Sequence, residues 1–409
     1  MTPIRPLFSL ARYWPAVGGS ELHTRELTQR LQPYADVRVV CHNSANGISN
    51  EAASAKAGRS SCHDVAVDVQ RVGPPAVTSM LMQGLARLHP HLRAARPIYD
   101  ELLRPLARQA LFDASHDRDL IHGVYNGLTT VAESALWAAR QRDIPFIWTP
   151  LAHTEAREGQ AWSSDRFKHL YREADALIAM TAYERDWLIQ RGARPSSTYI
   201  CPVGPLLTPT ANGARFRQAH GLGEAPMVLF LGRHVDSKGY RQLLEAAQKV
   251  WTQLPETRFV FIGPQTNESI ACFAQQSDQR VLVLDQISDS AKNDALDACT
   301  MLCVPSTQES LGVTYIEAWH YSKPVIGADI EVLRSVIADQ HDGLLTTPDS
   351  ASLTDALLTL LTNPTLCQRL GDNGRQKLDQ HYDWRKIATR MAAIYADVLN
   401  QKTPQQAVQ

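Results

Sequence analysis

The sequence has no CxxC pair, no apolar stretch long enough to span a bilayer and no excess of charge of either sign. Its seven cysteines are not accompanied by a histidine or cysteine cluster at zinc-binding spacing, so we expect no metal site. The formal net charge of -1 gives no support to nucleic-acid binding, which needs a basic footprint. Residues 1–8 lack the apolar core of a signal peptide, and we therefore expect a protein of the reducing cytoplasm.

A repeated strand–helix pattern covers most of the 409 residues, a length at which two or three domains are expected. Short apolar runs rich in β-formers alternate with longer helical patterns, which is typical of parallel sheets built from βαβ units. In the first half of the chain the expected strands are 6–10, 37–41, 65–69, 120–122, 146–149, 176–179 and 198–201. In the second half they are 227–231, 259–262, 281–284, 301–304 and 324–326.

The two halves predict two α/β domains, because a segment rich in Pro, Gly and Thr separates them. We expect the first domain at 1–205, a linker at 206–226 and the second domain at 227–383. Residues 384–400 are expected to form a helix that packs back toward the first domain, and 401–409 a polar tail. Parallel sheets of this kind bind ligands at the carboxyl ends of their strands, so a crevice is expected there.

Local features give further expectations in the first domain. Ser20 is expected to cap a helix that follows the first strand. Residues 43–61 are small and polar and are expected to form a loop. Residues 80–110 are helical in pattern and basic, with five arginines against two acids.

The first motif with chemical content is GRHVDSKG at 232–239, directly after an expected strand. Its glycines allow a tight turn and a close approach of the backbone to a ligand. Arg233 and Lys238 place two cations at the carboxyl end of that strand. Such a pair suits a diphosphate and can neutralise a leaving group without a metal. Taken alone, the pattern also fits a solvated loop with two ordinary surface charges.

The second motif is ESLGVTYIE at 309–317, between an expected strand and a helix. Free N–H groups at the start of a helix form an anion site, and Gly312 lets a ligand approach. Glu309 and Glu317 have seven residues between them; the first is placed to bind sugar hydroxyls and the second a ribose diol. Favourable acids in a first helical turn are the alternative explanation for one of the two glutamates.

Together these motifs resemble the GT-B glycosyltransferases, and within them the large retaining family 4, also called glycosyl transferases group 1. That family carries an Arg-(five-residue step)-Lys-Gly loop followed by Glu-(seven residues)-Glu, which Arg233, Lys238, Glu309 and Glu317 match. Further similarities are found at 15–21 (PAVGGSE), 175–188 (DALIAMTAYERDWL), Ala318, 323–325 (KPV) and 343–345 (GLL). The chain departs from the family pattern at 202–205, Ser322 and Ser335, which bears on donor identity more than on fold.

The resemblance implies an α/β GT-B fold, with two Rossmann-like, doubly wound parallel-sheet domains facing a central cleft. It implies a nucleotide diphosphate-sugar donor, a UDP- or GDP-sugar, whose diphosphate is held by two cations and whose ribose is held by the second glutamate. The base would lie just after the strand at 281–284, and Glu309 with the backbone after it would orient the sugar. The implied donor-binding residues are Gly18, Gly19, Gly232, Arg233, Lys238, Gln286, Ile287, Glu309, Ser310, Leu311, Gly312, Val313 and Glu317.

The catalytic residues implied by the resemblance are Glu309, Arg233, Lys238 and His153. His153 resembles a family position that contacts the donor sugar, although a lone histidine is more often structural than catalytic. His122 is expected to be an acceptor-side or structural residue. Both histidines are expected at carboxyl ends of first-domain strands, facing the crevice.

The implied reaction moves the sugar, with retention, to a hydroxyl of a sugar, lipid-linked or small-molecule acceptor in bacterial polysaccharide, glycolipid or glycoconjugate synthesis. No cofactor is implied, and no metal, because no Asp-x-Asp motif follows an expected strand. A nucleotide-sugar epimerase or hydrolase on the same fold stays an alternative. So does a non-catalytic partner subunit, although a degenerate subunit should have lost some of the charged motif residues. A periplasmic sugar-binding protein would need an export signal.

The segment 80–110 also suggests peripheral contact with the inner face of a membrane. Apolar residues recur near helical spacing, so one face could meet lipid while arginines meet anionic headgroups. These apolar residues are Met80, Leu81, Leu85, Leu88 and Leu92. The alternative is a set of ordinary acceptor-side helices, because prolines at positions 90, 97 and 105 interrupt the segment.

Overall fold

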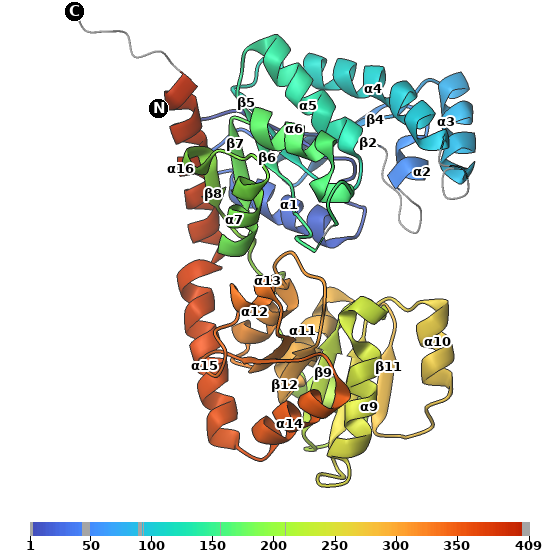
Figure 1. Ribbon diagram of the computed structural model, residues 1–409, viewed down its shortest axis with the longest axis vertical. Coiled ribbons are helices and arrows are strands. Elements are labelled where there is room, and N and C mark those ends of the chain that lie inside the picture. The colour runs from blue at the N-terminus through green and yellow to red at the C-terminus, as the bar shows by residue number, and fades with distance from the viewer. Residues whose placement is uncertain are drawn as a thin grey trace, which may run out of the picture. The chain divides into compact units, whose positions relative to one another are not determined.

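The computed structural model describes residues 3–42, 50–88, 92, 94–155, 157–208 and 210–402. The chain divides into two compact units (Figure 1). Unit 1 comprises Met1–Val203 together with Trp384–Gln409, and unit 2 comprises Gly204–Asp383. Each unit contains one central sheet of mainly parallel strands, which confirms the predicted α/β class.

The sheet of unit 1 has, among the described residues, eight strands in the order β3-β4-β2-β1-β5-β6-β7-β8. Neighbouring strands are parallel, except that β3 pairs antiparallel with β4 at one edge. The strands are β1 Pro6–Ser9, β2 Arg38–His42, β3 Ser60–Asp64, β4 Val67–Val72, β5 Leu120–Val124, β6 Phe146–Thr149, β7 Ala176–Ala179 and β8 Thr198–Ile200. The α-helices are α1 Gly19–Arg30, α2 Asn50–Ser54, α3 Ala76–Leu88, α4 Ala95–Ala114, α5 Thr129–Arg142, α6 Asp165–Glu173, α7 Ala182–Gln190 and α16 Trp384–Lys402.

The sheet of unit 2, within the same described ranges, has six parallel strands in the order β11-β10-β9-β12-β13-β14. This is the doubly wound Rossmann order, in which the chain reverses direction across the sheet between β9 and β12. The strands are β9 Met227–Leu231, β10 Arg258–Ile262, β11 Val281–Leu284, β12 Met301–Val304, β13 Val325–Ala328 and β14 Leu344–Thr346. The α-helices are α8 Gly213–Ala219, α9 Tyr240–Val250, α10 Asn267–Ala274, α11 Asp289–Ala298, α12 Val313–His320, α13 Glu331–Arg334, α14 Ser350–Leu361 and α15 Pro364–His381.

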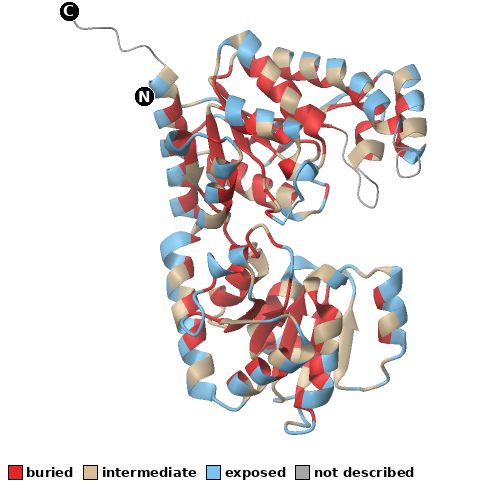
Figure 2. Ribbon diagram, in the orientation of Figure 1, coloured by how far each residue is buried: buried red, intermediate tan, exposed pale blue. Residues whose placement is uncertain are grey.

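The central strands are continuous apolar runs, because strands of a parallel sheet that is covered on both faces bury all their side chains. Strands β9 and β12 are buried along their whole length, whereas the edge strands β11 and β14 are half-buried. Figure 2 shows the same contrast between buried central strands and exposed outer helix faces. This burial is why most of these strands could be predicted from the sequence.

Helix α16 follows unit 2 in the sequence but is anchored in unit 1. Its buried side chains recur at helical spacing and form one apolar face: Trp384, Ile387, Ala388, Met391, Ile394, Tyr395 and Val398. The Tyr395 hydroxyl lies 2.7 Å from Nδ1 of His122 in β5, and the Tyr34 hydroxyl lies 3.0 Å from Oγ1 of Thr389. The helix is therefore held by both apolar packing and polar contacts with the first unit.

Several expectations for unit 1 differ from the observed elements, and the expected strand 65–69 is observed as β4, Val67–Val72. The expected loop 43–61 includes α2 and the start of β3, while its residues 43–49 lie outside the described residues. Strand β3 was missed because its sequence, SSCHD, is polar and exposed at a sheet edge. Ser20 lies inside α1, whose N-cap is Gly18. Residues 401–402 of the expected tail continue α16.

The segment expected to be a linker, 206–226, contains α8 and belongs to unit 2. The carboxylate of Asp294 in α11 holds this helix, because it accepts a 2.7 Å hydrogen bond from the Asn212 amide and another from Nε of Arg215. At Gly213 a Cβ atom would come within 2.7 Å of the Ala298 amide nitrogen. Such close backbone contact explains why a glycine-rich stretch here is structured.

Candidate active site

The two charged motifs of unit 2 lie at the point where the order of its strands reverses. Residues 232–239 follow β9, and residues 305–312 follow its neighbour β12. Because both strands are parallel, both loops leave the carboxyl edge of the sheet side by side. In open α/β sheets this is the usual position of a ligand site.

The two loops are joined by backbone contacts. The Ser237 carbonyl accepts hydrogen bonds from the Thr307 amide, at 2.8 Å, and from the Ser306 hydroxyl, at 3.2 Å. Gly239 has φ of 78°, and a Cβ atom there would lie 2.6 Å from Pro305 Cγ and from the Pro305 carbonyl oxygen. Glycine is therefore required both for the left-handed backbone and for the close approach of the loops.

Lys238 and Glu309 form an ion pair across these loops. Nζ of Lys238 lies 2.6 Å from Oε1 of Glu309, and the two side chains are 22% and 10% exposed. Arg233 is exposed, and its guanidinium makes no hydrogen bond or ion pair within the part of the chain that the structure describes. Lys238 is thus a paired cation at the carboxyl edge of the sheet, and Arg233 is a cation there that faces solvent.

The turn after Glu309 leads directly into helix α12. Its N-cap, Gly312, has φ of 77°, and a Cβ atom there would lie 2.6 Å from the ring of Tyr315. Leu311 and Gly312 are buried, whereas Ser310 and Val313 are half-buried. The first turn of a helix leaves backbone N–H groups without helical partners, so this turn presents hydrogen-bond donors beside the ion pair.

Glu317, one helical turn inside α12, is buried and already has protein partners. Its Oε1 accepts a 2.8 Å hydrogen bond from Nζ of Lys292 and a 3.2 Å bond from the Leu206 amide. Lys292 also donates to the Leu206 carbonyl at 3.1 Å. No local sequence pattern indicates Lys292 as a partner of Glu317, because it lies 25 residues away in a different helix. A ribose bound by Glu317 would therefore lie close to Lys292 and the backbone of Leu206.

Residues expected near a base lie at the end of the edge strand β11. Gln286 is exposed and Ile287 is half-buried, and among the described residues no further strand lies beyond β11. Gly232 follows β9 on the same sheet edge with φ of 157°. All of the expected donor-binding residues of unit 2 are therefore brought to one edge of one sheet, or to the helix that begins there.

His234 lies inside the first motif but is not available to a ligand. Its ring is fully buried among Phe230, Tyr240, Phe261 and Phe273. Neither ring nitrogen has a hydrogen-bond partner among the described residues, and burial lowers the pKa of His234 to about 4. The histidine therefore packs the base of the loop as a neutral ring.

Gly18 and Gly19 lie in unit 1 where the loop after β1 enters α1. Gly18 is the N-cap, and a Cβ atom there would lie 2.4 Å from Oε2 of Glu21. Glu21 is buried and accepts hydrogen bonds from Nε of Arg12, at 3.2 Å, and from the Ser20 hydroxyl, at 2.8 Å. A buried carboxylate thus fills the space behind the glycine turn.

The two histidines of unit 1 have different surroundings. His153 follows β6, is half-buried, and has its ring centroid 4.6 Å from that of Trp162. His122 is fully buried within β5, where its Nε2 lies 2.7 Å from the Thr149 hydroxyl and its Nδ1 lies beside Tyr395. Burial lowers the pKa of His122. The prediction that His122 sits at a strand end facing a crevice is wrong; it is the structural residue of the two alternatives.

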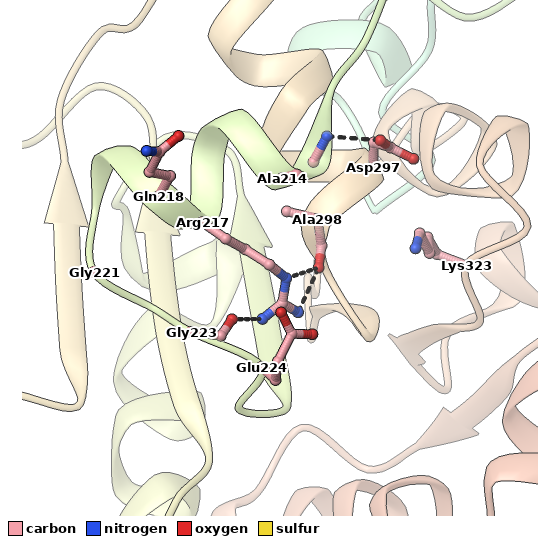
Figure 3. Close-up of a pocket in the computed structure, with 10 residues that line it drawn as sticks. Ala214, Arg217, Gln218, Gly221, Gly223, Glu224, Asp297, Ala298 and Lys323 are labelled. Carbon is pink, nitrogen blue, oxygen red and sulfur yellow. Dashed lines mark hydrogen bonds between the residues drawn. The ribbon is translucent and has the colours of Figure 1, made fainter.

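A separate pocket of unit 2 lies between α8 and the end of α11 (Figure 3). Its lining includes Arg217, whose guanidinium is engaged by the carbonyls of Gly223, Ala225 and Ala298. Lys323 also lines it. The pocket contains none of the residues of the two charged motifs, and its central guanidinium is occupied by the protein itself.

The described ranges lack both a metal-binding cluster and a membrane-spanning helix. They contain no cluster of three or more His, Cys, Asp or Glu side chains that could hold a metal ion. Nor do they contain a helix that is both long and apolar enough to cross a membrane.

Comparisons with known proteins agree with the geometry of both units. Residues 18–204 match the family described as glycosyl transferase 4-like domain, and residues 214–377 match glycosyl transferases group 1. The chain is 27% identical to the phosphatidyl-myo-inositol mannosyltransferase of Mycobacterium leprae, over 64% of this chain and 70% of that protein. It is 25% identical to the alpha-maltose-1-phosphate synthase of Mycolicibacterium smegmatis, over 94% and 97%.

Solved structures show the same fold. Anabaena HepE, crystallised in complex with UDP and glucose, has a TM-score of 0.72 at 19% identity and covers 96% of this chain and 100% of its own. Sucrose-phosphate synthase from Thermosynechococcus elongatus has a TM-score of 0.73 at 20% identity, with 98% and 100% covered. The chain belongs to the GT-B glycosyltransferases of group 1, family 4, and is a glycosyltransferase.

Proposed function

We propose that this glycosyltransferase takes its sugar from a nucleotide diphosphate-sugar bound at the carboxyl edge of the sheet of unit 2, and transfers it with retention of configuration to a hydroxyl acceptor. One observation carries the proposal. The Lys238–Glu309 ion pair joins the loops that follow β9 and β12, and it lies next to the N–H groups that begin α12. This arrangement combines a cation, a carboxylate and an anion-binding helix start within one sheet edge.

The chemistry of a diphosphate-sugar fits these groups. As the bond between the sugar and the diphosphate breaks, negative charge develops on the leaving diphosphate. Arg233 and Lys238 would stabilise that charge, which is the work that a divalent metal does in other enzymes, so we propose turnover without a metal. Glu309 would accept hydrogen bonds from sugar hydroxyls and hold Lys238 in place when no donor is present.

The remaining donor contacts follow the same sheet edge. The backbone of Ser310, Leu311 and Gly312 would contact the sugar, and Glu317 the ribose. Gln286 and Ile287 would lie beside the base. In unit 1, Gly18, Gly19 and His153 would contact the donor phosphates and sugar. The acceptor's proton would pass to a phosphate oxygen of the donor, on the face of the sugar from which the diphosphate leaves.

The relatives support a nucleotide-sugar donor but differ in acceptor. HepE was crystallised with UDP and glucose, and the Escherichia coli trehalose-6-phosphate protein with UDP-2-fluoro glucose. The named activities range from a phosphatidyl-inositol mannosyltransferase to a maltose-phosphate synthase. We therefore propose a UDP- or GDP-sugar donor and leave a sugar, lipid-linked or small-molecule acceptor as the three classes to be tested.

A peripheral membrane location is part of this proposal, and it rests on α3. One stripe of this helix exposes Val77, Met80, Leu81 and Leu88, each more than half exposed. Two of the arginines expected to meet anionic headgroups are already paired with carboxylates. Arg96 pairs with Glu51, and Arg104 lies 3.2 Å from Glu133, so both guanidinium groups are neutralised. A cytoplasmic enzyme that touches the membrane would do so mainly through the apolar stripe.

The test is a thermal-shift screen of nucleotide-sugars, followed by a transfer assay with candidate acceptors. A ligand at 100 times its dissociation constant adds about 2.7 kcal/mol of stability, so a true donor stands out from the other nucleotides. NMR of the product then gives its anomeric configuration, and retention is expected. Conversion of the donor without any acceptor would instead favour an epimerase or hydrolase. No response to any nucleotide-sugar would favour a non-catalytic subunit.

A further inference from the structure

Glu184 is a carboxylate of unit 1 with no exposed surface and a contact to two separate loops. It lies in the first turn of α7, at the carboxyl edge of the sheet. Its Oε1 accepts a 2.7 Å hydrogen bond from the Ala152 amide, in the loop after β6. Its Oε2 accepts a 2.6 Å bond from the Met180 amide, in the loop after β7. One side chain therefore ties together the loops that follow two neighbouring strands.

Capping of α7 accounts for only part of this arrangement. Thr181 is the N-cap, and its hydroxyl accepts a 3.0 Å bond from the Glu184 amide. In an ordinary capping box the glutamate returns its own side chain to the N-cap backbone. Here one carboxylate oxygen accepts a hydrogen bond from the Met180 amide, and the other accepts one from the Ala152 amide, which lies 32 residues before Glu184. Burial raises the pKa of Glu184 to about 7, and a cap at the helix surface would avoid that cost.

The loop that Glu184 reaches has a backbone that needs outside support. Leu151 has φ of 48°, in the left-handed region that non-glycine residues rarely adopt. The Pro150 carbonyl accepts a 3.1 Å hydrogen bond from Nε1 of Trp162, and the ring of His153 packs on that same indole. The hydrogen bond that the Ala152 amide donates to Glu184 lies between these two contacts in the sequence. It fixes the residue directly before His153.

We propose that Glu184 is a positioning residue, which holds the loop 150–154 in its left-handed conformation and thereby places His153 for its contact with the transferred sugar. Glu184 does not itself touch the sugar, because it is fully buried. The proposal rests on the proposed function, since it assigns to His153 a part in turnover. The structural part of the proposal, the hydrogen bond from the Ala152 amide to Glu184, can be measured without any substrate.

The test compares Glu184→Gln with Thr181→Val in the full chain. Glutamine has one acceptor oxygen where the carboxylate has two, and its NH2 group cannot accept a hydrogen bond from a backbone N–H, so one of the two loop contacts must break. Met180 lies only four residues from Glu184, whereas Ala152 lies 32 residues away in a separate loop, so the contact with Ala152 is the one expected to break. Thr181→Val removes the helix cap but leaves both carboxylate contacts in place. Hydrogen exchange at the Ala152 amide should speed up at least tenfold in Glu184→Gln and stay unchanged in Thr181→Val. The kcat should fall at least tenfold in Glu184→Gln alone, with a smaller change in the KM for donor.

A third variant separates a positioning role from general loss of structure. If Glu184 acts through His153, the double variant Glu184→Gln/His153→Ala should be no slower than His153→Ala. Wild-type exchange or wild-type kcat in Glu184→Gln, or losses that multiply in the double variant, would overturn the proposal. If the wild-type chain transfers no sugar, the proposed function fails, and exchange at Ala152 alone then decides on the hold. Should Glu184→Gln not fold, Glu184→Asp is too short to reach both amides and should give the same pattern.

Discussion

The Lys238–Glu309 pair allows a quantitative prediction, because its two members should work as one unit. Their charged atoms lie 2.6 Å apart, and both side chains are mostly buried, so each is the other's main partner when no donor is bound. We consider three variants: Lys238→Ala, Glu309→Ala and the double replacement. Removing either partner leaves a partly buried charge without its counter-ion. Lys238→Ala also removes a cation aimed at the leaving diphosphate, and Glu309→Ala removes the acceptor for the sugar hydroxyls.

The expected magnitude follows from comparable sites. Loss of one preorganised electrostatic group typically raises the barrier by ~3–4 kcal/mol, which is roughly 10²–10³-fold in kcat. If the two groups acted independently, the double variant would lose the sum, ~6–8 kcal/mol. Because Lys238 and Glu309 are in direct contact, we expect strong coupling, with the double variant losing little more than the worse single variant.

The assay is initial-rate transfer with the donor found by the nucleotide-sugar screen, with urea denaturation of each variant in parallel. Lys377→Ala is a matched control, because Nζ of Lys377 lies 2.7 Å from Asp342 and its side chain is 25% exposed, in the same unit. This control should lose stability and keep its kcat. Near wild-type turnover in both single variants would refute the site, and fully additive losses would refute the coupling.

Four further outcomes are expected. Turnover should persist in EDTA, and activity that returns only with Mg²⁺ or Mn²⁺ would contradict metal independence. In urea denaturation, Gly239→Ala should lower the free energy of unfolding by ~1–2 kcal/mol or more beyond the loss in Gly223→Ala, because both glycines have positive φ but only Gly239 faces atoms within 3 Å. Equal losses in the two variants would show that the contact with Pro305 does not matter. Burial lowers the pKa of His122 from 6.5 to about 3, so the unfolded state binds a proton that the folded state does not, and stability must fall as pH falls from 6.5 toward 3. Denaturation at pH 8 and 5 should show His122→Gln losing ~2 kcal/mol less than wild type over that interval, and equal losses would show that His122 does not carry the effect. In flotation with anionic liposomes, Leu81→Glu should reduce binding through the apolar stripe of α3, whereas wild-type protein that stays unbound at low salt would remove the membrane proposal.

The parts of the fold that could be predicted are those in which burial leaves a mark on the sequence. Strands β9 and β12 are fully buried and read as unbroken apolar runs, so their bounds were predicted without error. The loops after them carry glycine and charge at fixed spacing, which indicated the sheet edge where they meet. Strand β3 was missed because an exposed edge strand does not need apolar residues.

The contacts that could not be predicted join residues far apart in the sequence. The Tyr395 hydroxyl forms a hydrogen bond with His122, 273 residues earlier. His122, which was expected near a ligand, is therefore part of the core. Lys292 reaches Glu317, and Glu184 reaches Ala152, through side-chain geometry that no local pattern records. Spacing predicts which loops converge on a sheet edge, but only coordinates show which charged groups there already have partners.

The central claim is that a nucleoside diphosphate binds at the sheet edge of unit 2, against Lys238. Isothermal titration of UDP and of GDP into the 409-residue chain, Lys238→Ala and Lys377→Ala tests it most directly, since it needs neither the sugar nor the acceptor. We predict that one of the two nucleotides binds the wild-type chain, binds Lys377→Ala equally well, and binds Lys238→Ala at least tenfold more weakly. Absence of binding by both nucleotides, or equal affinity for the wild-type chain and Lys238→Ala, would contradict the claim.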